Sequence, residues 1–86
     1  MKQFVCTIGD PLGIHARPAG LIVRAAKEFP DTMVSIEKEG NSVRATQLMK
    51  LMGMGVRQGD RIKVTAEGPD ENKAIQAMQK LFADHL

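Results

Sequence analysis

The sequence has little cysteine and no long apolar run, and each shortage excludes a class of protein. The single cysteine, Cys6, cannot form an internal disulfide. One cysteine and two histidines cannot supply the ligands of a closed structural zinc site. No stretch approaches about 18 consecutive apolar residues, the length that a membrane-spanning helix needs. We therefore predict no metal, no cofactor, no membrane insertion and a cytoplasmic location.

Aromatic residues and concentrated positive charge, two marks of nucleic-acid binding, are also scarce. Aromatic side chains make up 3% of the residues, all of them Phe, so the chain offers no platform for stacked bases. The formal net charge is +2 and the basic residues are scattered, which gives no stripe for a phosphate backbone. Nucleic acid is therefore not an expected partner. With 86 residues, 43% of them hydrophobic, the chain fits one domain over residues 1–86.

Hydrophobic residues recur with two different periods, and the period identifies each element. Period-two alternation predicts four strands, over residues 2–8, 34–37, 42–44 and 61–66. Spacings of three and four predict three helices, over residues 16–29, 46–51 and 71–82. Thr46 and Asp70 are expected as helix N-caps, and residues 39–41 as the tight turn of a β-hairpin. This order favours an antiparallel sheet with helices packed on one face, an α+β fold.

His15 stands between a turn-rich segment and the start of a helix. Residues 9–13 contain two glycines, Asp10 and Pro11, and therefore predict a loop. The first N–H groups of the following helix lack intrahelical acceptors, so with the helix dipole they form a site for an anion such as phosphate. The same helix end disfavours an imidazolium, which leaves a neutral ring with a nitrogen lone pair that can attack phosphorus.

Arg17 lies in the first turn of the same helix, two residues after His15. Its planar guanidinium can bind two phosphate oxygens at once and does not lose its charge. It would therefore steady a phosphorylated His15. The pattern alone leaves a simpler alternative open, in which His15 only caps the helix and Arg17 is a solvated surface charge.

The stretch Gly13-Ile14-His15-Ala16-Arg17-Pro18-Ala19 resembles the phosphorylation-site motif of the HPr family, the histidine-containing phosphocarriers of the phosphoenolpyruvate-dependent sugar phosphotransferase system. The similarity extends over the whole chain, through the turn at 39–40, the segment 48–52, Gly55 and the segment 62–68. The resemblance implies an open-faced sandwich, a four-stranded antiparallel sheet with three helices packed on one face, in the order βαββαβα.

The resemblance also implies a function and roles for individual residues. His15 would accept a phosphoryl group on Nδ1 from enzyme I, charged by phosphoenolpyruvate, and pass it to enzyme IIA domains of sugar transporters. Arg17 would shield and orient the phosphohistidine, and Pro18 would fix the start of the helix that faces the phosphate. A protein of this kind is a phosphoryl carrier and not an enzyme, and we expect it to be a monomer.

A short segment near the middle of the chain concentrates apolar side chains. Four of them fall within seven residues: Leu48, Met49, Met52 and Met54. A short element can bury only part of this set, and methionine adapts to different partner surfaces, although core packing is the alternative. By resemblance, the exposed members form a docking patch beside the histidine. The residues implied for this surface are Leu48, Met49, Met52, Ala16, Pro18, Gly20, Arg24 and Gly55.

One departure from the family pattern concerns regulation. In many Gram-positive relatives a kinase phosphorylates a serine at the start of the short helix, but the aligned residue here is Gln47, preceded by Thr46. We therefore predict no serine-type regulation. Outside these motifs, His85 is expected to be an exposed bystander near the end of the chain, and Cys6 a buried small hydrophobic residue without a function.

Two other functions remain open from the sequence. A regulatory module of a nitrogen-related or other dedicated phosphotransfer branch would act by phosphorylation-dependent binding, and His15 and Arg17 fit that function equally well. Stand-alone catalysis is the least favoured, because only Asp10 among the titratable residues is placed beside His15 by the sequence.

Overall fold

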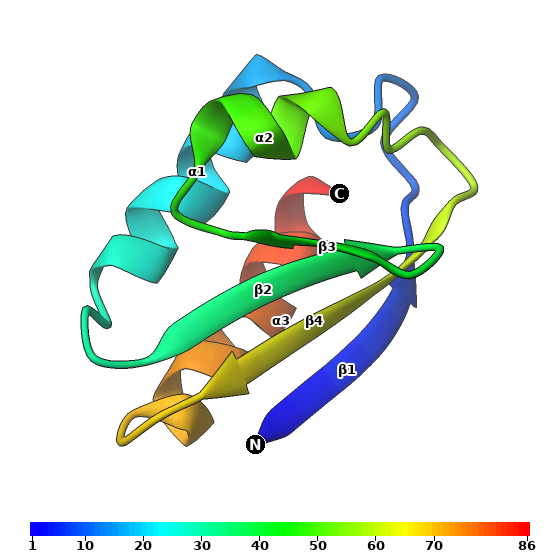
Figure 1. Cartoon of the computed structure of the whole chain (residues 1–86). Helices are drawn as coiled ribbons and strands as arrows, with labels where there is room; N and C mark the ends of the chain where they lie inside the picture. The colour runs from blue at the N-terminus through cyan, green and yellow to red at the C-terminus, as the bar shows by residue number, and fades with distance from the viewer.

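The computed structural model describes residues 1–86 and has the predicted order of elements (Figure 1). The strands are β1 (Lys2–Thr7), β2 (Met33–Lys38), β3 (Asn41–Arg44) and β4 (Arg61–Glu67). The helices are α1 (Ala16–Lys27), α2 (Leu48–Gly53) and α3 (Glu71–His85). All strand pairs are antiparallel and the sheet order is β1-β4-β2-β3. The predicted open-faced α+β sandwich is confirmed.

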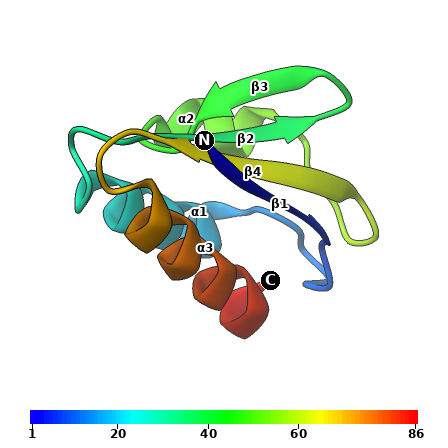
Figure 2. The same cartoon turned by 90° about the horizontal axis from the view of Figure 1, so that it is seen from below.

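The hydrophobic core lies between the sheet and the helices that cover it (Figure 2). The alternating residues of β4 point inward and are closed to solvent: Ile62, Val64 and Ala66. The predicted apolar stripe of α3 faces them and is buried at Ala74, Ile75, Met78 and Phe82. The helix α2 buries only one side chain, Leu51, in the same core. No helix of the molecule has the length and apolar character needed to cross a membrane.

The predicted hairpin joins β2 to β3 through a two-residue turn. Lys38 pairs with Asn41, and the two residues between them, Glu39 and Gly40, have φ angles of 52° and 82°. Two successive positive φ angles characterise the hairpin turns whose twist matches that of the flanking strands. Glycine adopts this geometry without a steric penalty, whereas Glu39 is held in it by the strand pairing on both sides.

The expected boundaries of α2 are wrong by one residue at the N-cap and by two residues at the end, because the helix continues past Leu51 to Gly53. The helix begins at Leu48, and its N-cap is Gln47 and not Thr46. Ala45 is fully buried and its N–H donates to the carbonyl oxygen of Val34 at 2.8 Å. Because the chain is still attached to the sheet at this residue, it must first turn away before a helix can begin.

The predicted cap of α3 is also incorrect in one detail. Asp70 occupies the N-cap position, but its side chain forms no capping hydrogen bond. Its N–H instead donates to the Thr32 hydroxyl at 2.9 Å, while Glu71 accepts from the N–H of Gly68 at 3.3 Å. The first turn of α3 is therefore tied to the start of β2 through Thr32.

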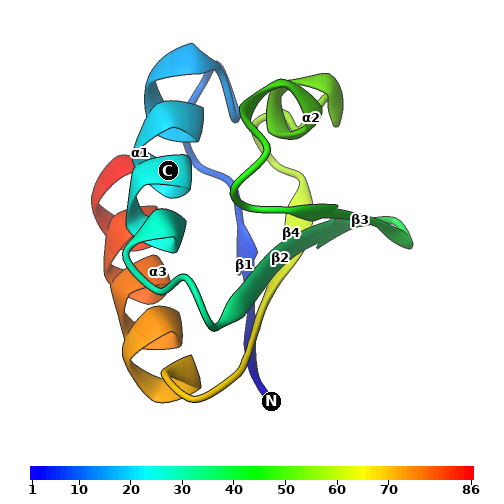
Figure 3. The same cartoon turned by 60° about the vertical axis from the view of Figure 1, so that its left-hand side comes forward.

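The topology brings the start of α1 and the end of α3 to one edge of the molecule. β1 and β4 are antiparallel neighbours, and each is followed by a helix that returns along the same face. The beginning of α1 therefore lies beside the end of α3, while α2 lies on the other side of α1 (Figure 3). His15 is at this edge.

Candidate functional site

The loop before α1, residues 8–15, packs closely against the loop 56–60. The Ile14 N–H donates to the carbonyl oxygen of Val56 at 3.2 Å. Gly13 has a φ angle of +67°, and a Cβ atom added to it would lie 2.8 Å from the Cα of residue 57 and closer still to the Val56 oxygen. Only glycine satisfies both the left-handed backbone and the lack of space. The residue that begins the motif therefore sets the path of the loop toward His15.

The end of α3 holds the same loop from the other side. The N–H groups of Gly9 and Asp10 both donate to the carbonyl oxygen of Leu86, the second at 3.0 Å. The Asp10 carboxylate in turn accepts from the Leu12 N–H at 2.8 Å, closing a local turn. Two elements far apart in the sequence thus fix the loop in place.

A network of hydrogen bonds holds the loop 56–60 in place. The Asp60 carboxylate accepts from the Lys38 ammonium at 2.8 Å and from the Arg57 N–H at 2.8 Å. Lys38 also donates to the carbonyl oxygen of Gly55 at 3.0 Å. The Lys38 hydrogen bond, together with the Arg57 N–H, lowers the pKa of Asp60 below its usual value.

His15 occupies the N-cap position of α1 in an extended conformation, with φ −106° and ψ −171°. Its side chain forms no capping hydrogen bond, so the imidazole does not take the capping role that the simpler alternative gives it. Nε2 lies 3.8 Å from Oδ1 of Asp10, and the imidazole is about one-third exposed, with 34% of its surface accessible. Nδ1 has no hydrogen-bond partner. One ring nitrogen therefore faces a carboxylate and the other is free to react.

The first turn of α1 presents unpaired donors next to this free nitrogen. The N–H groups of Ala16 and Arg17 have no acceptor, and Pro18 in the same turn has no N–H to satisfy. The first turn contains no acidic residue. The Arg17 side chain is exposed and forms no ion pair. Free N–H donors, an exposed guanidinium and the absence of acidic residues are the features that the predicted anion site at the helix start requires.

A hollow of about 290 Å³ lies at the site, between the loop, α1 and the end of α3. It is lined by Asp10, His15, Arg17, Pro18, Leu21, Asp84 and His85. His85 is exposed, as expected, but it is not remote: it shares this hollow with His15 and Arg17. Periodicity could not reveal this proximity. The proximity follows from the antiparallel pairing of β1 with β4, which places the start of α1 beside the end of α3.

The surface of α2 is apolar, as predicted. We call Leu48, Met49 and Met52 the α2 patch; their exposed fractions are 40%, 77% and 38%. Core packing, the alternative, holds only for Leu51, which is fully buried, and for Met54, which is partly buried against the core. The α2 patch is therefore available to a partner.

The other expected surface residues fall into two groups. Ala16 and Gly55 are exposed, and α2 packs against α1 on this side of the molecule (Figure 3). Gly20 and Arg24 are exposed but line a separate hollow with His85, on the side of α1 that faces α3. Pro18 is buried and contributes to the wall of the His15 hollow.

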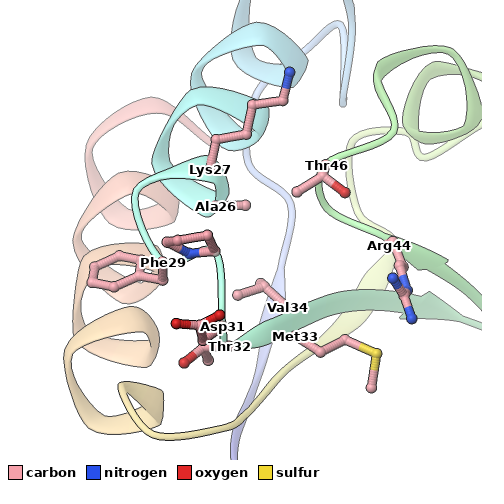
Figure 4. A pocket seen from close by; sticks show the side chains of 10 residues that line it. Ala26, Lys27, Phe29, Asp31, Thr32, Met33, Val34, Arg44 and Thr46 are labelled. Atoms are coloured by element: carbon pink, nitrogen blue, oxygen red, sulfur yellow. The ribbon is translucent and has the colours of Figure 1, made fainter.

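Another hollow, of about 350 Å³, lies at the far end of α1 (Figure 4). Its walls include Ala26, Val34 and Thr46, and the charged ends of Lys27 and Arg44 extend away from it (Figure 4). It contains no histidine or cysteine and no converging polar groups, so it offers no chemistry comparable to that at His15.

Two remaining predictions concern metals and Cys6. No group of three or more His, Cys, Asp or Glu side chains is arranged to hold a metal ion. Cys6 is partly buried and packs against the core, and this burial raises the pKa of its thiol. A raised pKa reduces the thiolate fraction, which makes a reactive role unfavourable.

Comparisons with known proteins agree with this geometry. A family described as the PTS HPr component phosphorylation site matches residues 2–84. The phosphocarrier protein HPr of Mycoplasma pneumoniae is 34% identical over 85 residues, covering 99% of this chain and 97% of the relative. The crystal structure of HPr from Thermoanaerobacter tengcongensis superposes with a TM-score of 0.90 at 40% identity, covering 96% of this chain and 92% of that one. A dimeric form of HPr from the same organism gives a TM-score of 0.76 at 39% identity, covering 98% and 95%.

Proposed function

The chain belongs to the HPr family, the phosphocarrier proteins of the phosphotransferase system, and we propose that His15 is the residue that carries the phosphoryl group. The protein is a carrier and not an enzyme. The observation that supports His15 is its free Nδ1 beside the unpaired N–H groups of Ala16 and Arg17.

The geometry is consistent with nucleophilic attack by Nδ1. In the neutral ring the proton sits on Nε2, whose nearest charged neighbour is the Asp10 carboxylate at 3.8 Å. The Nδ1 lone pair then forms the N–P bond while the bond between phosphorus and the donor protein breaks. The step is reversed when an acceptor protein takes the phosphoryl group. No proton has to leave the ring in either direction.

Arg17 and the helix start stabilise the charge that arrives with the phosphoryl group. The group carries close to two negative charges near neutral pH. The guanidinium can donate two parallel hydrogen bonds to its oxygens, and the free N–H groups of Ala16 and Arg17 lie at the positive end of the α1 dipole. Pro18 contributes by starting the helix without adding a further unpaired donor.

The partners we propose are enzyme I as the phosphoryl donor and enzyme IIA domains of sugar transporters as acceptors. A single apolar surface, the α2 patch together with Ala16 and Gly55, would dock on both, because methionine side chains adapt to different contacts. Gly20 and Arg24 would contact partners from the α3 side of the site. We propose that the protein acts as a cytoplasmic monomer, although a dimeric form of a relative is known.

Regulation at the start of α2 is not part of this proposal. Gln47, the N-cap of α2, stands where many relatives have a phosphorylated serine, and its amide cannot accept a phosphoryl ester. The regulatory module of a dedicated branch remains a second candidate, but the phosphocarrier names of the relatives do not favour it.

Intact-mass measurement of the protein incubated with phosphoenolpyruvate and enzyme I tests the assignment. The solution is kept neutral to basic to preserve the acid-labile phosphohistidine. We expect one added phosphoryl group on the native protein and none on His15→Ala, whose circular dichroism spectrum and Tm should match the native ones because the imidazole is partly exposed and forms no capping hydrogen bond. Labelling of a folded His15→Ala protein would refute His15 as the acceptor.

A further inference from the structure

The hollow beside His15 contains a second imidazole that the proposed function does not use. His85 is exposed and forms no hydrogen bond and no ion pair, so its ring is free to respond to a new charge. It is the last residue of α3, and the next carbonyl group, of Leu86, is hydrogen-bonded to the loop that carries His15. Its backbone is therefore fixed relative to the site.

The residues that line this hollow carry too little positive charge to balance a phosphoryl group on His15. Two carboxylates, Asp10 and Asp84, and one guanidinium, Arg17, line it. Adding a phosphoryl dianion to His15 makes the surroundings negative even though the ring keeps its Nε2 proton and becomes a cation, because that ring and Arg17 do not balance two carboxylates and a dianion. Of the remaining lining residues, only His85 can gain a positive charge.

The position of His85 on its helix supports the same role. The C-terminal end of a helix carries partial negative charge, which stabilises a cation there, whereas the N-terminal end disfavours one. His85 lies at the C-terminal end of α3 and His15 at the N-terminal end of α1. The charged and titratable groups that share hollows with His85 are Asp10, His15, Arg17, Arg24, Glu28, Lys80 and Asp84.

We propose that His85 is a positioning residue that takes up a proton when His15 is phosphorylated and, as an imidazolium, faces the phosphoryl group opposite Arg17. This inference rests on the proposed function of His15. It makes the affinity of the carrier for its phosphoryl group depend on pH. By thermodynamic linkage, a phosphoryl group that favours protonation of His85 is itself held more tightly when His85 is protonated.

The expected change in the proton affinity of His85 follows from Coulomb's law. No hydrogen bond joins the two rings, so we take a separation of about 6 Å across the shared hollow as a working value. At that separation a dianion in water-like surroundings changes the proton affinity of an imidazole by roughly tenfold. The same factor, about tenfold, is the greatest preference that His85 can confer on the phosphorylated form.

A competition between two carriers measures this factor directly. Native protein and His85→Gln are mixed in equal amounts with catalytic enzyme I and limiting phosphoenolpyruvate, so that phosphoryl groups equilibrate between them. Intact mass separates the four species. Because both carriers share one donor, the pH dependence of enzyme I cancels. We expect the native protein to hold the phosphoryl groups in a preference that approaches about tenfold at pH 6 and disappears at pH 9.

Two further variants separate a charge effect from a structural one. His85→Arg keeps a positive charge at all pH values and should match or exceed the native protein at pH 6 and surpass it at pH 9. Lys73→Gln removes a positive charge from the same helix at an exposed residue that lines none of the hollows around His85, and should compete equally with the native protein at every pH.

The histidine resonances provide a second test. The chain has only two histidines, so imidazole NMR signals are assigned by comparison with His85→Gln. The titration midpoint of His85 should rise by roughly one pH unit on phosphorylation. An unmoved midpoint, or a preference over His85→Gln that does not change with pH, would overturn the role of His85 while leaving His15 as the acceptor. Absence of phosphorylation on His15 would instead remove the proposed function, and this inference with it.

Discussion

Replacement of Gly13 by alanine should be among the most damaging single-methyl changes in this protein. The backbone there has a φ angle of +67°, which costs a non-glycine residue about 1 kcal/mol. The new Cβ would also lie 2.8 Å from the Cα of Arg57 and closer to the Val56 oxygen, so the two loops must separate. Separation loses the hydrogen bond from Ile14 to Val56, worth about 1 kcal/mol, and packing of similar size.

The total destabilisation expected for Gly13→Ala is about 3 kcal/mol. In a domain of this size that lowers Tm by roughly 12 to 24 °C. Urea denaturation followed by circular dichroism measures the free energy of unfolding, and differential scanning calorimetry measures Tm. Because the displaced loop carries His15, the rate of phosphorylation by enzyme I should fall as well, even at a temperature where the variant is fully folded.

Two other glycines provide matched controls for the same chemical change. Gly55 has a nearly identical φ angle of +69° but open space around its Cα, so Gly55→Ala should cost only the conformational term, about 1 kcal/mol. Gly20 lies within α1, also with open space, so Gly20→Ala should stabilise the protein by about 0.5 to 1 kcal/mol. If Gly13→Ala proved no more destabilising than Gly55→Ala, the close approach of the two loops would be refuted.

Three further predictions address the site, the surface and the response to acid. Arg17→Lys keeps the charge but loses the two-pronged donor set, so stopped-flow transfer from enzyme I should slow by about tenfold or more, and unchanged rates would refute bidentate binding. Met49→Asp should weaken binding of enzyme I with Tm unchanged, whereas Leu51→Ala should cost about 2 to 5 kcal/mol of stability; equal losses of stability would contradict the assignment of surface and core. The lowered pKa of Asp60 stabilises the fold above its ordinary value of 3.8, and this contribution is lost as the pH falls further through the folded value. Acid titration of Asp60→Asn should therefore show lower stability at neutral pH and a flatter decline below pH 4 than the native protein, and parallel curves would remove Asp60 from the acid response.

The elements that the sequence predicts well are those whose hydrophobic pattern is long and regular. The stripe from Ala74 to Phe82 identifies α3, and the alternation from Arg61 to Ala66 identifies β4, because each repeats its period several times. The short α2 is predicted less well. Thr46 looks like an N-cap, but the hydrogen bond from Ala45 to Val34 keeps the chain on the sheet, and local preference yields to that tertiary contact.

The residues of the candidate site also differ in how well the sequence predicts them. His15 and Arg17 lie at the start of α1, and the sequence around them predicts that helix start, so the motif alone indicates them. The proximity of His85 depends on how β1 and β4 pair and on the end of α3 reaching the loop before α1. Neither is encoded in the residues around His85, and for that reason its position could be learned only from the assembled fold.

The strand order has a consequence for how the protein is made. β1 is an edge strand whose only neighbour is β4, some 60 residues later in the sequence. During synthesis on a ribosome, β1 therefore stays unpaired until β4 has been made. The loop before His15 can form its hydrogen bonds to Leu86 only after that residue has been added. Nascent fragments that lack Leu86 would therefore carry His15 on a loop without the carbonyl group that anchors it at Gly9 and Asp10.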